Sequence, residues 1–137
     1  MRYYAVIDTN VIVSAMLKWD SVPGQVVRFV FEGKIVPLLH SAVVEEYHKV
    51  LLRPKFHLTD QIVDDFLLDL EEHGIYMDAE PLDLALPDPK DRIFYEIVIT
   101  ARRNEDVWLV TGNLRHFPIQ PFVVSPRQML EVIERDL

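Results

Sequence analysis

The sequence contains no cysteine, which excludes disulfide bonds and metal sites built from thiolates. It also lacks an uninterrupted apolar run of the roughly eighteen or more residues that a membrane span needs. The opening residues, MRYYAVIDT, hold a single arginine and an apolar run too short for a secretory signal. We therefore expect a cytoplasmic protein without a membrane segment.

Basic residues are scarce, because 14 Lys and Arg stand against 22 Asp and Glu and give a net charge of −8. Proteins that bind nucleic acid broadly need basic side chains to neutralise phosphates, so this class is disfavoured. An enzyme that acts on nucleic acid is not excluded. Carboxylates gathered around a metal ion count as negative only until the ion binds.

The length of 137 residues suits one hydrophobic core and is short for two ordinary domains. Apolar runs of strand length alternate with segments of helical periodicity, without a repeat or a Gly/Ser linker. Uninterrupted apolar strands separated by helices indicate a parallel sheet covered on both faces. We predict a single α/β domain over residues 1–137.

The pattern also predicts where the elements lie. The expected strands are Tyr3–Ile7, Ile35–Leu39, 75–77, Val107–Val110 and 122–124. Helices are expected over 10–17, 23–32, 41–52 and Asp60–His73, with two more beginning at Asp91 and at Ser125-Pro126. Thr9 or Asn10 is the expected cap of the first helix and Ser41 that of the third.

Polar side chains follow the ends of these strands. Asp8 comes directly after the first strand, and Glu46 lies one turn into the helix after the second. Asp91 opens the helix that precedes the next long strand, and Thr111 and Asn113 follow that strand. Ligands of open parallel sheets bind beyond the carboxyl ends of the strands. We therefore expect these side chains to converge.

Each of these residues also has a purely structural interpretation. Asp8 and Asp91 suit helix N-termini, where a carboxylate gains about 0.3–1 kcal/mol. Glu46 suits a solvated helix surface, and Thr111-Gly112-Asn113 suits a turn. Convergence favours a metal site, because two carboxylates about 4 Å apart repel by on the order of 4 kcal/mol at an effective dielectric constant of about 20. Oxygen ligands select Mg²⁺ or Mn²⁺.

Four segments resemble PIN-domain proteins in their order and spacing, and together they span nearly the whole chain. They are VIDTNVIVSA, SAVVEEYHKVLLRPKF, LPDPKDRIFYEIVITA and DVWLVTGNLRHFP. The chain is most similar to stand-alone prokaryotic PIN proteins of the VapC type, the toxins of toxin–antitoxin pairs. The resemblance implies a three-layer α/β/α sandwich with a mainly parallel sheet, and metal-dependent hydrolysis of RNA phosphodiester bonds.

The resemblance also implies roles for individual residues. Asp8, Glu46 and Asp91 match the acidic positions that hold Mg²⁺ or Mn²⁺, with Asp88 beside Asp91 as a candidate substitute ligand or as a residue that supports the ligands. Asn113 completes the catalytic set, although many relatives carry an aspartate there, and this loss of charge bears on whether one metal or two are bound. The expected supporting residues are Asn10, Ser41 and Thr111. The best-placed RNA contacts are Arg115 and His116, and the other candidates for phosphate contacts are Arg53, Lys55, Arg92, Arg102 and Arg103.

Two other functions remain open at this stage. A PIN fold with one carboxylate fewer and an acidic surface would suit a module that binds RNA or protein without cutting. The DTNV segment also resembles the DxDx[TV] motif of haloacid dehalogenase-like phosphatases, but Asn10 stands where that motif needs its second aspartate. The expected partners are an RNA substrate, a cognate antitoxin and, because of the apolar helices, a second copy of the chain.

Overall fold

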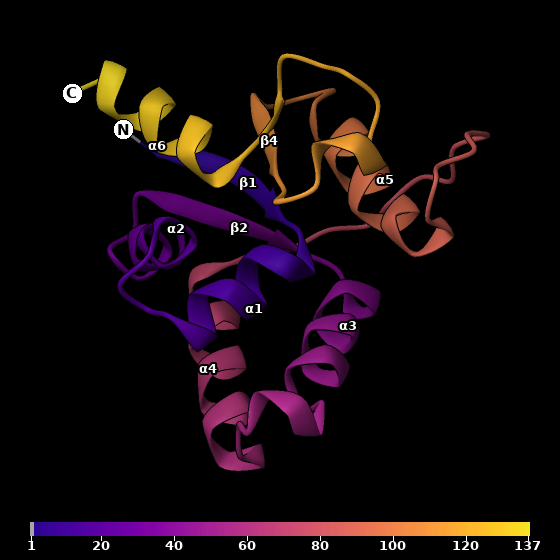
Figure 1. Ribbon diagram of the computed structural model, residues 1–137. Coiled ribbons are helices and arrows are strands. Elements are labelled where there is room, and N and C mark those ends of the chain that lie inside the picture. Colours follow the sequence, from indigo (N-terminus) through magenta and orange to yellow (C-terminus); the bar gives the residue numbers. More distant parts are fainter. Residues whose placement is uncertain (1) are drawn as a thin grey trace.

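A parallel sheet runs through the middle of the protein (Figure 1). The computed structural model describes residues 2–137, and within them the strand order is β3-β2-β1-β4-β5. Every neighbouring pair in this order is parallel. The strands are β1 (Tyr3–Ile7), β2 (Ile35–Leu39), β3 (Ile75–Tyr76), β4 (Val107–Val110) and β5 (Val123–Val124).

Helices cover both faces of this sheet, so the predicted three-layer α/β/α sandwich is confirmed. On one side α2 packs against β2 and is flanked by α1 and α6, while α5 packs against β1 and β4. The helices are α1 (Thr9–Leu17), α2 (Val22–Phe31), α3 (Ser41–Leu51), α4 (Asp60–His73), α5 (Arg92–Ala101) and α6 (Pro126–Arg135). Three single-turn 3₁₀ helices lie between them, η1 (Pro54–Phe56), η2 (Pro89–Asp91) and η3 (Leu114–His116).

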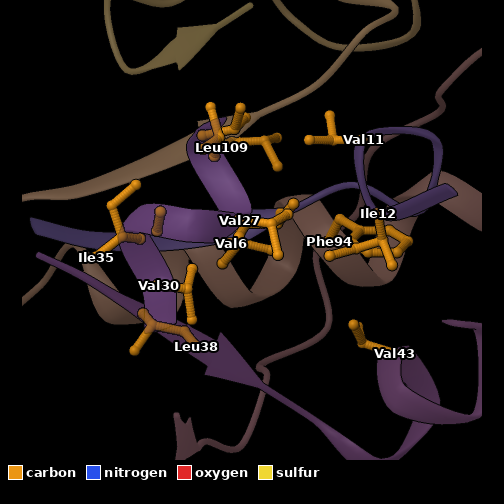
Figure 2. Close-up of a cluster of buried hydrophobic side chains, with 14 of the residues drawn as sticks. Val6, Val11, Ile12, Val27, Val30, Ile35, Leu38, Val43, Phe94 and Leu109 are labelled. Atoms are coloured by element: carbon orange, nitrogen blue, oxygen red, sulfur yellow. The ribbon is translucent and has the colours of Figure 1, made fainter. Parts of the chain in front are cut away.

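The central strands are apolar throughout because helices exclude water from both of their faces. All five residues of β2 are buried, and Val6 and Leu109 in β1 and β4 have no exposed surface. Figure 2 shows Val6, Leu109 and the β2 residues Ile35 and Leu38 in one buried cluster with Val27 and Val30 of α2. The unbroken hydrophobicity of the strands therefore predicted their place in the sheet correctly.

Two helix caps differ from the prediction. The N-cap of α1 is Asp8, whose side chain accepts a hydrogen bond from Thr9 N, rather than Thr9 or Asn10. The N-cap of α3 is His40, whose Nδ1 accepts from Ala42 N at 3.0 Å, and Ser41 is the first helical residue. Sequence preference favours Ser over His at a cap, but an unprotonated imidazole nitrogen is an equally competent acceptor.

The amphipathic pattern of α4 predicted its buried face, with one exception. Val63, Phe66, Leu67 and Leu70 are buried as expected, whereas Ile62 is 48% exposed. None of the helices in residues 2–137 combines the length and the apolarity needed to cross a membrane.

The strand register determines which loops meet at the carboxyl edge of the sheet. Ile7 of β1 is paired with Val110 of β4, and Asp8 N donates to Val110 O at 2.9 Å. The ladder thus continues one residue past β1 and brings Asp8 beside Thr111. This backbone pairing therefore positions the first two residues of the candidate site.

Candidate active site

Asp8 is fixed through both of its carboxylate oxygens. Oδ1 accepts from Thr9 N and Oδ2 accepts from the hydroxyl of Thr111, each at 2.8 Å. Asp8 is only 5% exposed and Thr111 is fully buried. The cap interpretation of Asp8 is therefore correct but incomplete, because one oxygen serves the helix and the other faces the end of β4. Each oxygen keeps a second lone pair for another ligand.

Tyr47 ties α3 to the end of β1. Its ring is buried, and its hydroxyl donates to the carbonyl oxygen of Ile7, the residue before Asp8. This contact fixes the rotation of α3, and Glu46 is half-buried and lines the same pocket as Asp8. Glu45, its neighbour in sequence, is exposed and turned to a different surface.

Asp91 lies at the start of α5 but makes no capping hydrogen bond with its side chain. Its Oδ2 instead lies 2.9 Å from His116 Nδ1, and Nε2 of the same ring lies 2.9 Å from Asn113 Nδ2. An ionised carboxylate can only accept, so Nδ1 carries the proton and Nε2 accepts from the Asn113 amide. Among residues 2–137 the amide oxygen of Asn113 accepts no hydrogen bond, so it can bind a ligand.

These side chains line one pocket of about 380 Å³, which we call the acidic pocket. Asn10 stands at its edge, where its Oδ1 accepts from Gly112 N at 3.0 Å and fixes the loop after β4. Four carboxylates, two basic residues and several neutral side chains line the pocket, among them Asp8, Glu46, Asp88, Asp91, Arg53, Lys90, Asn10, Asn113, His116, Phe56 and Phe94.

Burial and nearby negative charge raise the pKa values of two pocket carboxylates, Asp8 and Asp91. Burial raises the pKa of Asp8 to about 6, and the charge of Asp91 adds to the rise, while the hydrogen bond from Thr111 opposes it. The pKa of Asp91 is also raised, first by burial and then by the charges of Asp88 and Glu46, against the hydrogen bond from His116. The negative charges of the pocket therefore disfavour one another, which is the condition that a bound cation relieves.

The donors of this pocket fit a divalent cation. In residues 2–137, one group of acidic and imidazole side chains has ligand atoms within 4.8 Å of one another, namely Asp88, Asp91 and His116. Asp8 and Glu46 line the same pocket outside this tight group. A divalent cation would supply the positive charge that these carboxylates lack.

The structure thus gathers most of the residues that the sequence singled out. Asp8, Asn10, Glu46, Asp88, Asp91, Asn113 and His116 line the acidic pocket, and Thr111 supports it from beneath. Ser41 does not reach it, because Ser41 is exposed and lines a separate groove between α3 and α4. Arg115 is exposed on η3 and is not part of the pocket lining.

Two basic residues line the pocket, of which Arg53 was among the candidate phosphate contacts and Lys90 was not. Lys90 lies between Asp88 and Asp91 in sequence, and this position inside an acidic loop was its only signal. Arg53 follows α3 and also lines the pocket. Arg102 and Arg103, by contrast, pair with Asp106 and Glu80 on the protein surface.

Comparison with known proteins agrees with this geometry. A family profile described as a PIN domain matches residues 4–115. The chain belongs to the PIN-domain family. The matched region of this PIN domain includes every carboxylate of the acidic pocket, together with Thr111 and Asn113.

A relative of this PIN domain is the uncharacterised protein MJ1680 of Methanocaldococcus jannaschii. The two are 38% identical over 55 residues, which are 40% of this chain and 36% of the relative. The match thus spans about a third of the relative's length. PIN domains are generally metal-dependent nucleases, and the acidic pocket has the donors that such an enzyme requires.

Proposed function

We propose that this PIN domain is a metal-dependent endoribonuclease that hydrolyses RNA phosphodiester bonds. The observation that carries the proposal is the convergence of Asp8, Glu46 and Asp91 in one pocket from three separate segments of the chain. Gathering carboxylates in this way costs stability unless a cation neutralises them, and strongly perturbed acids in a pocket are typical of functional sites.

The residues of the acidic pocket divide into distinct roles. Asp8, Glu46 and Asp91 would hold the cation, with Asp88 close enough to Asp91 to contribute a further carboxylate oxygen. A bound Mg²⁺ or Mn²⁺ supplies the positive charge that stabilises a phosphodiester under attack by water. Asn113, held by His116 through its amide nitrogen, presents its amide oxygen to orient that water.

Basic and aromatic residues of the same pocket bind the RNA. Lys90 and Arg53 lie where they can neutralise the phosphates that flank the cut bond. Phe56 is half-buried at the pocket and offers a face on which an unpaired base can stack. We therefore propose single-stranded RNA as the substrate class.

Activity that depends on a divalent cation is the first expected result. Purified protein should cut a fluorogenic single-stranded RNA in Mn²⁺ or Mg²⁺ and should stop when EDTA is added, because the pocket carboxylates cannot stabilise the reacting phosphate without a cation. A folded protein that binds this RNA but cuts no RNA with any divalent cation would instead be the non-enzymatic binding module.

We further propose that the chain is the toxin of a type II toxin–antitoxin pair and that it forms a homodimer. The support for the toxin role is the resemblance of its four motif segments to VapC-type proteins. A neighbouring reading frame whose product binds this chain and stops RNA cleavage would establish the antitoxin. If light scattering shows a monomer at all accessible concentrations, the proposed homodimer is contradicted.

A further inference from the structure

The groove between α3 and α4 lies apart from the acidic pocket and has a volume of about 570 Å³, in the range of pockets that hold drug-sized ligands. We call it the α3–α4 groove. Residues of both helices and Tyr76 of the edge strand β3 line it. Its position leaves the catalytic proposal untouched, because none of its lining residues belongs to the acidic pocket.

The floor of this groove is apolar and accessible. Leu68 is 60% exposed and Tyr76 is 52% exposed, and the less exposed Leu67 and Val44 also line the groove. Large apolar side chains that gather in one exposed groove indicate a surface that another molecule covers.

The rim of the groove is acidic. Glu45, Asp64 and Glu71 line it, and its lining includes no lysine or arginine. The sequence of α4, DQIVDDFLLDLEEH, carries six carboxylates and again no lysine or arginine. Across the groove His48 Nε2 lies 3.3 Å from Asp64 Oδ1, which leaves the remaining carboxylates of the rim without a cationic partner in the lining.

The negative charge of the rim favours some classes of binding partner over others. RNA and anionic membranes would bring phosphates against these carboxylates, and a second copy of the chain would bring its own α4 carboxylates against them. A partner with lysine or arginine around apolar side chains meets both the rim and the floor. Because the groove lies between two helices, an amphipathic helix can lie along it with its apolar face against the floor.

We propose that the α3–α4 groove binds a basic amphipathic helix of another protein. Leucine-like side chains of that helix rest on Leu68 and Tyr76, and its basic side chains pair with Asp64 and Glu71. The inference concerns an interaction surface and stands whether or not the protein cuts RNA.

A labelled helical peptide with leucine on one face and lysine on the other tests this proposal. It should bind the protein, and a peptide with glutamate in place of every lysine should not. The double substitution Asp64→Lys and Glu71→Lys should weaken binding by about tenfold or more, since two rim pairs are each reversed. Leu68→Ser should weaken it by about fivefold through lost apolar contact.

The matched control is the double substitution Glu131→Lys and Glu134→Lys on α6, which changes the net charge equally at exposed positions outside the groove. This control should keep affinity within about threefold of the wild type. All variants concern exposed or half-exposed side chains, and an unchanged melting curve verifies their fold. Equal losses in both double variants, or no binding by the wild type, would overturn the proposal.

Discussion

Replacing Glu46 by Gln should reduce RNA cleavage at least about a hundredfold, whereas Glu45→Gln should leave it within about twofold. A carboxylate that helps to hold a catalytic cation contributes several kcal/mol to transition-state stabilisation, and each 1.36 kcal/mol corresponds to about tenfold in rate. The two glutamates are adjacent in sequence and on the same helix, but Glu46 lines the acidic pocket and Glu45 lines the α3–α4 groove.

This pair is a matched control, because both substitutions remove one negative charge from α3 and leave its length unchanged. Single-turnover cleavage of a labelled RNA in saturating Mn²⁺ measures the effect. RNA affinity in EDTA should not fall in either variant, since losing a carboxylate reduces repulsion of phosphate. Equal activities of the two variants would show that the pocket is not the site of cleavage.

In the metal-free protein, the contribution of Asp8 to the free energy of unfolding should increase as the pH falls from about 7 to about 5. Its folded-state pKa of about 6 lies above the ordinary value of 3.8, so the folded state binds the proton more tightly than the unfolded state. This stabilisation is fully present below the pKa that Asp8 has in the unfolded state. It is lost as the pH rises through the pKa that Asp8 has in the folded state. It totals about 3 kcal/mol, of which about 1.3 kcal/mol falls between pH 5 and 7.

Urea denaturation of the wild type and of Asp8→Asn in EDTA, at both pH values, isolates this contribution from the other carboxylates. The difference between the two proteins should change by about 1 kcal/mol between the two pH values. In saturating Mn²⁺ the trend for the wild type should reverse, because the cation binds the ionised carboxylates. An unchanged difference in EDTA would mean that Asp8 is no more perturbed than an exposed carboxyl.

The sequence was sufficient to predict the sheet and most of the pocket, because both follow from local signals. Unbroken apolar strands such as β2 are typical of a parallel sheet, and the edge where such strands end is common to all of them. The proximity of Asp8 and Thr111 could therefore be predicted from the sequence alone.

Other features depend on contacts that no local pattern encodes. Ser41 was expected as the cap of α3 and, from the family resemblance, as a supporting residue of the site, yet His40 is the cap and Ser41 lines another groove. The bridge from Asp91 through His116 to Asn113 depends on how η3 packs against α5, over a separation that periodicity does not reach. The bridge also explains why position 113 is asparagine rather than aspartate, since an amide can donate to the imidazole and an ionised aspartate cannot.

The most direct test of the proposed metal centre is the melting temperature of the wild type and of Asp8→Asn, each in EDTA and in excess Mn²⁺. In EDTA at neutral pH the variant should melt at least as high as the wild type, because relief of the buried charge, worth about 3 kcal/mol, exceeds the loss of the Thr111 hydrogen bond, worth about 1 kcal/mol. Mn²⁺ should raise the melting temperature of the wild type and not that of the variant. A variant that melts lower in EDTA and keeps the full Mn²⁺ shift would contradict the metal centre and leave Asp8 as a helix cap alone.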